Sequence, residues 1–159
     1  MWMKPLRELQ FDQIVGRLPA GFDVLRSEAA SEGRRFIERL HDEWQSGEQR
    51  FNRAHEVLLA ARFNHELAGI GGMTVDPDLP SAMRMRRFFI RFAYRRRGLG
   101  RQLAAAILNR TIPKGTIVTV NADNADAAAF WEALGFQRGS KLGHSHWLAW
   151  EPSRDRPGV

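Results

Sequence analysis

The residues best placed to do chemistry are the cations and glycines of the stretch AYRRRGLGRQLA, residues 93–104. Arg95, Arg96 and Arg97 lead into Gly98 and Gly100, and an apolar helical pattern begins at once. The first N–H groups of a helix have no partner inside the helix, and the helix dipole adds positive charge there. Glycines let an anion approach the backbone, and each arginine can add a charge-assisted hydrogen bond worth about 1.5–3 kcal/mol. The turn is therefore predicted to bind a phosphorylated ligand.

Several other interpretations of this turn have to be weighed. It lacks the Gly-Lys-Ser/Thr of a mononucleotide loop and the GxGxxG of a dinucleotide fold. A run of arginines by itself is often only a solvated turn, but the Gly-x-Gly and the helix start argue against that here. The longer stretch RMRRFFIRFAYRRRGLGR mixes arginine with aromatic residues, as single-strand nucleic-acid binders do. Strand alternation would bury several of these aromatics, and no RNP, helix-turn-helix or zinc pattern is present.

Composition narrows the class of protein. Lys and Arg total 24 against 18 Asp and Glu, and the net charge of +6 favours an anionic partner. The length of 159 residues, with 43% hydrophobic residues, suits a single globular domain. The absence of cysteine excludes disulfides and a cysteine nucleophile. No apolar run approaches the roughly 20 residues of a membrane span, and the first residues lack a signal-peptide pattern. We expect a cytoplasmic protein that does not enter a membrane.

Changes in hydrophobic period predict the elements that position the turn. A short strand is expected within residues 6–15, and helical spacing over 21–45 has a break at 31–33 that divides it into two helices. Strands are expected at 56–63, 67–75, 83–92, 116–120, 136–138 and 145–151, and helices at 100–110 and 126–134. Asn64-His65 is expected to form a tight turn. This order predicts an α+β fold: one domain over residues 1–151 with a mixed, mostly antiparallel sheet flanked by helices, and a disordered tail at 152–159.

Two blocks resemble the GCN5-related N-acetyltransferase (GNAT) superfamily. AYRRRGLGRQLAAAIL resembles its acetyl-CoA motif, Arg/Gln-x-x-Gly-x-Gly/Ala, at Arg95 to Gly100. NADAAAFWEALGF is similar to the segment Asn-x-x-Ala-x-x-x-Tyr-Glu-x-Leu-Gly-Phe. The matching positions of this second block are Asn124, Ala127, Glu132, Leu134, Gly135 and Phe136. The blocks occur in the family's order and cover residues 84–136, so the resemblance implies a GNAT-like fold.

The resemblance also implies where acetyl-CoA, the co-substrate, would bind. The pyrophosphate would lie on the backbone amides of Gly98, Leu99, Gly100 and Arg101. The pantetheine arm would follow the end of the preceding strand at Phe89 and Ile90, and Asn124 would contact the arm or the reacting end. Arg95, Arg96 and Arg97 would meet the phosphates. No metal is implied.

One position departs from the family pattern. The family often has a tyrosine where this chain has Trp131, and that tyrosine is commonly the general acid for the departing thiolate. An indole N–H cannot supply a proton near pH 7. Trp131 could donate a hydrogen bond to sulfur or line the thioester channel, or it could be a core aromatic residue. Tyr94, the single tyrosine, matches a different position.

The incoming amine needs a base, because an alkyl ammonium with a pKa near ~10.4 is protonated at pH 7. His146 and Glu43 are the preferred candidates for this role, although each could instead serve packing or the surface. The backbone N–H of Ile90 is expected to stabilise the carbonyl oxygen. The other candidates for the base are His41, Asp76 and His144.

The sequence thus favours an N-acetyltransferase that moves an acetyl group from acetyl-CoA to a primary amine by direct attack in a ternary complex. The acceptor could be a small molecule or a protein amine, with specificity from the N-terminal helices and the loop at 139–144. A catalytically inactive CoA-binding regulator is the first alternative, because Trp131 and the unassigned base leave it open. A nucleic-acid-binding protein is the second. Dimerisation is common in the family, so a homodimer is one possible state.

Overall fold

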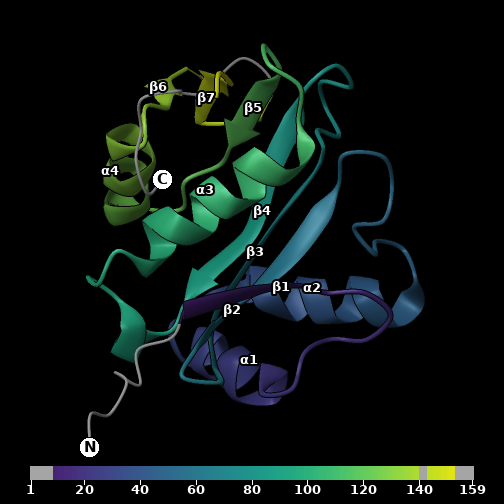
Figure 1. Cartoon of the computed structure of the whole chain (residues 1–159), viewed down its shortest axis with the longest axis vertical. Helices are drawn as coiled ribbons and strands as arrows, with labels where there is room; N and C mark the ends of the chain where they lie inside the picture. Colours follow the sequence, from purple (N-terminus) through teal and green to yellow (C-terminus); the bar gives the residue numbers. More distant parts are fainter. Residues whose placement is uncertain (1–8, 140–142, 153–159) are drawn as a thin grey trace, which may run out of the picture.

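The computed structural model describes residues 9–139 and 143–152. Figure 1 shows a single twisted sheet with α1 and α2 at one end of the long axis and α4, β5 and β7 at the other. In chain order the elements are β1 (Leu9–Gln13), α1 (Phe22–Ser31), α2 (Arg35–Ser46), β2 (Val57–Phe63), β3 (Glu66–Val75), β4 (Met83–Ile90), the 3-10 helix η1 (Phe92–Tyr94), α3 (Leu99–Thr111), β5 (Ile117–Val120), α4 (Ala125–Ala133), β6 (Gln137–Arg138) and β7 (His146–Ala149).

The expected α+β fold is confirmed. The order of strands in the sheet is β1-β2-β3-β4-β5-β7-β6. The predicted strands and helices are all present with small shifts at their ends, and the third long strand ends at Ile90 because η1 follows it. The tail predicted to be disordered lies outside the described residues, apart from residue 152.

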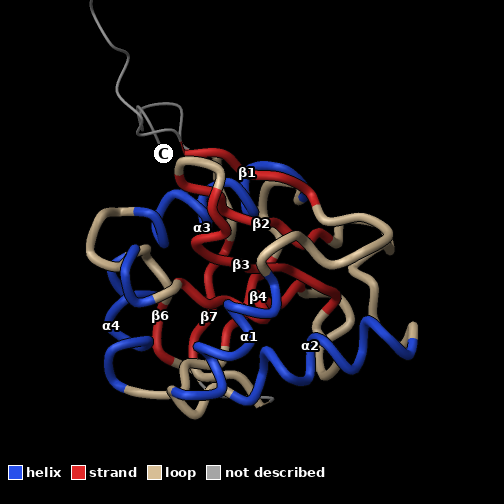
Figure 2. The backbone as a smooth tube through the Cα atoms, turned by 90° about the horizontal axis from the view of Figure 1, so that it is seen from below, coloured by secondary structure: helices blue, strands red, loops and turns tan. Residues whose placement is uncertain are grey.

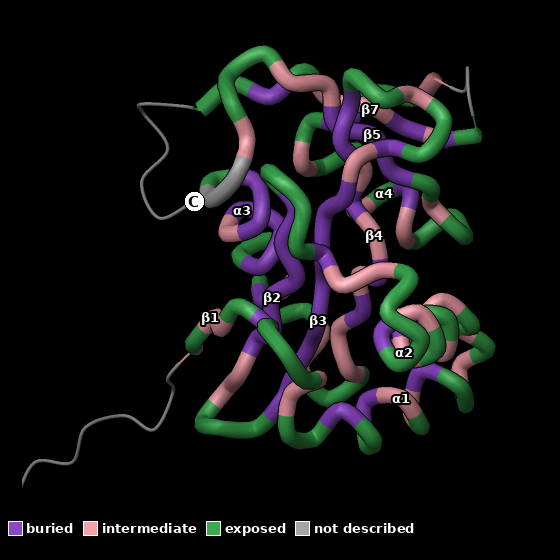
Figure 3. Tube along the Cα trace, turned by 90° about the vertical axis from the view of Figure 1, so that its right-hand side faces the viewer, coloured by how far each residue is buried: buried purple, intermediate pink, exposed green. Residues whose placement is uncertain are grey.

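The hairpin between β2 and β3 forms at the predicted tight turn. Asn64 and His65 have φ angles of 50° and 72°. Positive φ at both central residues defines the type I′ turn, whose twist matches that of two paired strands. The turn sets the register that places the buried strand β3 in the middle of the sheet (Figure 3).

Two hydrophobic cores cover the two faces of the sheet. Leu59 and Ala61 of β2 face the core that contains α3, whereas Leu58 and Ala60 face the core that contains α1 and α2. This alternation follows from the period of two along a strand. Figure 2 shows α1 and α2 together on one side of the strands, with α3 on the other. The fold therefore keeps the N-terminal helices and α3 on opposite faces of the sheet.

The sheet opens between its two central strands. Every pair of neighbouring strands is antiparallel except β4 and β5. The parallel pairing is short, because only Met83 and Arg84 of β4 have partners on β5, namely Val118 and Thr119. From Met85 onward β4 has an edge that β5 does not cover.

Candidate active site

A β-bulge lies in β4 beside this opening. Arg86 is paired with Gly72 of β3, and Phe89 is paired with Ile70. One residue of β3 therefore faces two residues of β4, and Arg87, with a φ of 57°, takes the unusual backbone conformation. A bulge bends its strand and increases the local twist, which helps β4 to diverge from β5.

The bulge can be related to the sequence. In RMRRFF the alternation of methionine and arginine breaks at the doubled arginine, Arg86-Arg87. A break in a period of two is the signal that could have predicted the extra residue. Reading this segment as a plain strand missed both the bulge and the positions of the two arginines.

The backbone of Ile90 faces the uncovered edge. The N–H of Arg91 donates a hydrogen bond of 2.9 Å to the carbonyl of Ala68 on the β3 side. Successive residues of a strand direct their N–H groups to opposite edges, so the Ile90 N–H points toward the opening. The Ile90 carbonyl already accepts a bond of 2.8 Å from Arg95 Nε. Of its two backbone groups, the N–H is the one available for a ligand.

No described residue neutralises the N-terminus of α3. The first hydrogen bond of this helix joins the Gln102 N–H to the Gly98 carbonyl at 3.1 Å, so the preceding N–H groups have no partner within the helix. No side chain in the described part of the chain caps the helix, and its first turn has no acidic residue. The first turns of α1, α2 and α4 each contain one. The positive end of the α3 dipole is therefore open to an anion.

Glycine is required at the two positions of the turn, Gly98 and Gly100, for different structural reasons. Gly98 has a φ of 78°, and a Cβ there would make only an ordinary contact with Gln102 Nε2 at 4.0 Å, so the conformation itself requires glycine. A Cβ at Gly100 would lie 3.1 Å from Phe130 Cε1 and 3.6 Å from Ile90 Cγ1. Gly100 thus lets α3 pack closely against α4 and β4, a role beyond the approach of a phosphate that the sequence predicted.

The four arginines of the turn are not equivalent. Arg95 binds Glu32 at 2.6 Å and lies over the Phe89 ring, so it joins the turn to α1. Arg97 lies over the Phe63 ring at 5.8 Å. Arg96, Arg97 and Arg101 are exposed, and none makes an ion pair with a carboxylate in the described part of the chain. These three remain available for phosphates. A phosphate contact by Arg95 stays a prediction.

Trp131 lies in an aromatic cluster behind the opening. It is 4% exposed, and its ring centroid is 5.0 Å from Phe88, 4.9 Å from Phe130 and 5.2 Å from Phe136. This placement matches the interpretation of Trp131 as a core aromatic residue. Whether the indole also reaches the sulfur stays a prediction.

Asn124 is the N-cap of α4. Its Oδ1 accepts a hydrogen bond of 2.8 Å from the Ala127 N–H. The side-chain amide N–H groups make no hydrogen bond within the described ranges, so they can donate to a ligand. A contact between Asn124 and the pantetheine arm stays a prediction.

The two preferred bases lie on opposite faces of the sheet. Glu43 of α2 accepts a 2.7 Å hydrogen bond from Arg87 Nη2, so its carboxylate lies beside the bulge. His146 belongs to the α4 side and is only 2% exposed. Its Nε2 is 2.8 Å from Glu132, and its Nδ1 is 2.7 Å from Ser145 Oγ. The hydrogen bond from His146, together with the charge of Arg138, lowers the pKa of Glu132 against the effect of its partial burial.

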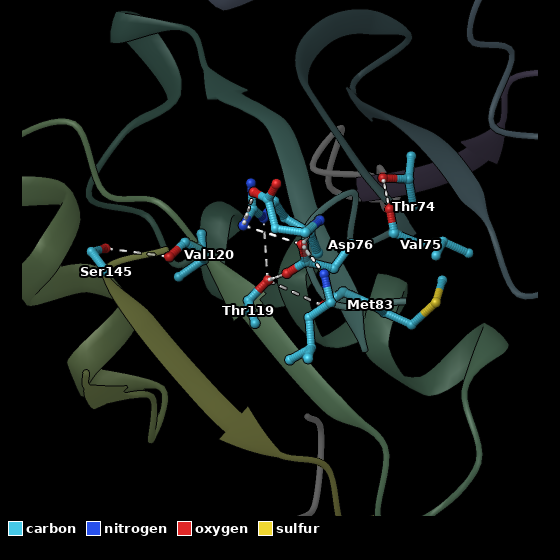
Figure 4. Close-up of polar contacts among 10 residues, drawn as sticks. Thr74, Val75, Asp76, Met83, Thr119, Val120 and Ser145 are labelled. Atoms are coloured by element: carbon cyan, nitrogen blue, oxygen red, sulfur yellow. Dashed lines mark hydrogen bonds and ion pairs between the residues drawn. The ribbon is translucent and has the colours of Figure 1, made fainter. Parts of the chain in front are cut away.

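Asp76 joins the strands at the closed end of the opening. Its Oδ2 accepts a 2.6 Å bond from Thr119 of β5, and its Oδ1 lies 3.3 Å from Arg84 of β4. The N–H groups of Asp78 and Leu79 donate to Oδ1 as well. Figure 4 shows Asp76 and Thr119 pointing toward one another between the strands. All these contacts are made within the protein, so the Asp76 carboxylate has a structural role.

The electrostatics of Asp76 agree with this role. Burial alone would raise its pKa, but the hydrogen bonds from Thr119, Asp78 and Leu79 and the charge of Arg84 outweigh burial and leave the pKa lowered. The carboxylate is therefore ionised at neutral pH and holds the ends of β4 and β5 together.

The remaining histidine candidates lie elsewhere. His41 Nδ1 is 3.1 Å from Asp42. His144 is buried, and its Nδ1 has no hydrogen-bond partner in the described ranges. A cavity of about 510 Å³ beside His144 is lined by residues from the end of β5 to β7, including Asn121, Arg138 and Ser145. Part of the loop predicted to select the acceptor, residues 140–142, lies outside the described residues.

One side-chain group has the geometry to hold a cation. Ligand atoms of Glu38, His41 and Asp42 lie within 4.8 Å of one another. Both carboxylate oxygens of Glu38 already accept hydrogen bonds from Arg26. Because this carboxylate is engaged, the group is poorly suited to a metal.

No helix among the described residues is both long and apolar enough to cross a membrane.

Comparisons with known proteins agree on one family. The family model described as "Acetyltransferase (GNAT) domain" matches residues 23–153. A search of curated proteins gives no match. Among solved structures, a protein of Exiguobacterium sp. 255-15 is 19% identical with a TM-score of 0.77, covering 89% of this chain and 93% of that one.

Two further structures contain the co-substrate or its product. A GNAT family N-acetyltransferase from Escherichia coli in complex with CoA is 16% identical with a TM-score of 0.64, covering 92% of this chain and 83% of that one. A GNAT family acetyltransferase from Elizabethkingia anophelis with acetyl-CoA bound is 13% identical with a TM-score of 0.56, covering 83% and 78%. At these identities the structures show a shared fold.

Proposed function

The chain belongs to the GNAT acetyltransferase family, and from this premise we propose that it transfers the acetyl group of acetyl-CoA to a primary amine by direct attack within a ternary complex. The observation that carries the proposal is the uncapped N-terminus of α3 beside the edge of β4 that β5 leaves uncovered. The first feature suits a pyrophosphate, and the second suits an extended amide-containing arm.

Acetyl-CoA would bind along these two features. The backbone N–H groups of Gly98, Leu99, Gly100 and Arg101 would hold the pyrophosphate, with added charge from Arg96 and Arg97. The arm would follow Phe89 and Ile90, within reach of the free amide N–H groups of Asn124. Arg95 would act mainly by holding the Ile90 carbonyl and α1 in place, because its guanidinium is already bound to both.

The reaction forms a C–N bond and breaks the C–S bond of the thioester. The Ile90 N–H would donate to the carbonyl oxygen as negative charge develops there. A thiol has a pKa near ~8.5, so coenzyme A can leave as the thiolate without a strong general acid. Trp131 would then serve as a wall of the site, consistent with its place in the aromatic cluster.

Glu43 is the proposed base that accepts the amine proton, directly or through a water molecule. Its carboxylate lies at the bulge and remains partly exposed, at 21% of its side chain. His146 is the second candidate, but it is buried, and both of its ring nitrogens have hydrogen-bond partners. Proton transfer to His146 would require one of those bonds to break.

The location and assembly of the protein are also proposals. We place the enzyme in the cytoplasm, where acetyl-CoA is available. The proposal includes both small-molecule amines and protein amines as acceptors. It also includes a homodimer as one state of the protein in solution, which a measurement of the molecular mass would test. The inactive CoA-binding regulator would bind acetyl-CoA but release no thiol with any amine.

The experiment is thiol release from acetyl-CoA with a panel of amines, for the wild type and Glu43→Gln. We expect the variant to lose about 10²- to 10⁴-fold in kcat while its affinity for acetyl-CoA changes less than about twofold. Glu48→Gln is the matched control, because Glu48 is exposed just beyond α2. Full activity of Glu43→Gln would remove Glu43 as the base. Binding of acetyl-CoA without turnover by the wild type would favour the regulator.

A further inference from the structure

Positive charge is concentrated on the face of β4 that lies toward α2. Met83 and Met85 point into the core with α3, so Arg84 and Arg86 point to the opposite face. The bulge then lets the next residue, Arg87, reach the same side, where it binds Glu43 of α2. Three arginines of one strand are thus collected on the face from which α2 packs against β4.

These arginines are not equally neutralised. Arg84 has Asp76 and Asp78 as ion-pair partners, and Arg87 has Glu43. Arg86 makes no ion pair or side-chain hydrogen bond to any residue in the described ranges. On α2, the exposed Arg39 likewise has no ion-pair partner among them.

The unpaired charge of Arg86 is partly withdrawn from water. Burial is the largest cause that lowers the pKa of Arg86, and the charge of Arg87 is the next. The charges of Arg84 and Arg39 also lower this pKa, whereas the charge of Glu43 raises it. Arg87 provides a second observation at the same place. Its side chain is only 7% exposed, and its buried Nε has no hydrogen-bond partner in the described part of the protein.

Glu43 attracts Arg86, but its carboxylate is already paired with Arg87, so Arg86 has no ion pair of its own in the described ranges. A partly buried cation of this kind is unfavourable unless a further anion can approach it. The free charge of Arg86 lies next to Glu43, a carboxylate suited to face an amine. The two side chains together match a molecule that carries both an ammonium and a carboxylate group.

We infer that the acceptor is an amino carboxylate, a small primary amine that also carries a carboxylate, and that Arg86 binds this carboxylate while Glu43 faces the amine. The inference rests on the proposed acetyl transfer and narrows its substrate class. Arginine suits this contact because its planar fork can bind a carboxylate through two parallel hydrogen bonds. Arg39 adds positive charge at the edge of the same site.

The test compares matched amines that differ only in the carboxylate. β-Alanine, L-lysine and L-phenylalanine are each paired with their carboxamides, and thiol release from acetyl-CoA is measured. We expect the best carboxylate form to exceed its carboxamide in kcat/KM by about 10- to 100-fold, the usual range for a charge-assisted contact. An α-carboxamide has the less basic amine, so amine ionisation alone would favour the carboxamides.

Variants of Arg86 test whether this residue causes the preference for the carboxylate form of the amine. Arg86→Gln should lower kcat/KM for the carboxylate form by about 10- to 100-fold more than kcat/KM for the carboxamide, so that the advantage of the carboxylate form is lost, and it should leave acetyl-CoA affinity unchanged. Arg86→Lys should restore part of the advantage. Arg17→Gln is the charge-matched control on an exposed loop, and it should retain the wild-type preference.

A second readout does not depend on turnover. With CoA present, an amino carboxylate should raise the midpoint of thermal unfolding of the wild type more than its carboxamide does, because ligands stabilise the folded state they bind. Arg86→Gln should abolish this difference. The inference would be overturned if the carboxylate and carboxamide forms had equal kcat/KM and stabilised the protein equally. It would also be overturned if peptides with amidated C-termini had a higher kcat/KM than the amino carboxylates. Failure of acetyl-CoA to bind would instead refute the proposed function.

Discussion

Replacing Asp76 by Asn tests the carboxylate that joins β4 to β5 at the closed end of the opening. The side chain is buried and accepts bonds from Thr119 Oγ1 at 2.6 Å and from the Asp78 and Leu79 N–H groups at 2.8 and 3.2 Å. Asparagine has nearly the same shape. It removes the charge, and its NH₂ group replaces one of the two accepting oxygens.

The expected cost follows from these contacts. Hydrogen bonds to a charged group contribute about 1.5–3 kcal/mol, against about 0.5–1.5 kcal/mol for neutral ones. Several such bonds weaken together, and Arg84 loses its partner at 3.3 Å while retaining Asp78 at 3.7 Å. We therefore expect Asp76→Asn to lower the free energy of unfolding by about 2–4 kcal/mol. For a domain of this size that corresponds to a fall of about 4–16 °C in Tm.

The assay is urea unfolding at a series of pH values. The folded-state pKa of Asp76 lies below its ordinary value, so the ionised carboxylate stabilises the fold above the unfolded-state pKa of ~3.9. That contribution is lost as the pH falls through the folded-state pKa. The difference between wild type and variant should be constant above about pH 5 and should shrink below about pH 4.

The control is Asp78→Asn, which changes an exposed carboxylate in the same loop. Its distance of 3.7 Å from Arg84 and its exposure of 53% predict a cost of less than about 1 kcal/mol. Equal costs for the two variants, or a cost for Asp76→Asn that does not change at acid pH, would refute the account of this carboxylate.

Three further predictions concern the turn, the buried histidine and the single tyrosine. Gly98→Ala should cost about 1–2 kcal/mol in urea unfolding, because the added methyl group would make only an ordinary contact, 4.0 Å from Gln102 Nε2, but the φ of 78° is left-handed; no loss would contradict that conformation. His146→Ala should cost about 1–3 kcal/mol because two partly buried hydrogen bonds are lost, with kcat within about threefold of wild type; a large loss of kcat in a stable protein would make His146 the base. Tyr94 should ionise above its usual pKa in an ultraviolet titration, because its hydroxyl donates to Glu66 at 2.7 Å, and Glu66→Gln should bring the pKa down.

Local patterns accounted for much of the fold. The period of two predicted the central strands, and Asn64-His65 predicted a turn whose positive φ angles few other residue types adopt readily. The start of α3 at Leu99 lies one residue from the predicted start at Gly100, because the glycines, the arginines and the apolar spacing agree. Each of these features depends on neighbours within a few residues.

Contacts between distant residues were not predictable in the same way. Arg95 looks like a phosphate ligand in the sequence, but its guanidinium binds Glu32, which lies 63 residues away. Asp76 looks like a candidate base, yet Thr119 and Arg84 surround it once the sheet has formed. Trp131 could not be assigned until Phe88 and Phe136 were placed around it. A sequence gives residue types and spacing, whereas these roles depend on packing across the sheet.

The central claim is that the N-terminus of α3 and the uncovered edge of β4 bind acetyl-CoA. Calorimetric titration of the full chain with acetyl-CoA at two salt concentrations tests this claim most directly. We expect one site per chain with micromolar affinity that weakens at higher salt, because salt screens the charge that the exposed arginines of the turn contribute. The absence of binding at both salt concentrations would contradict it.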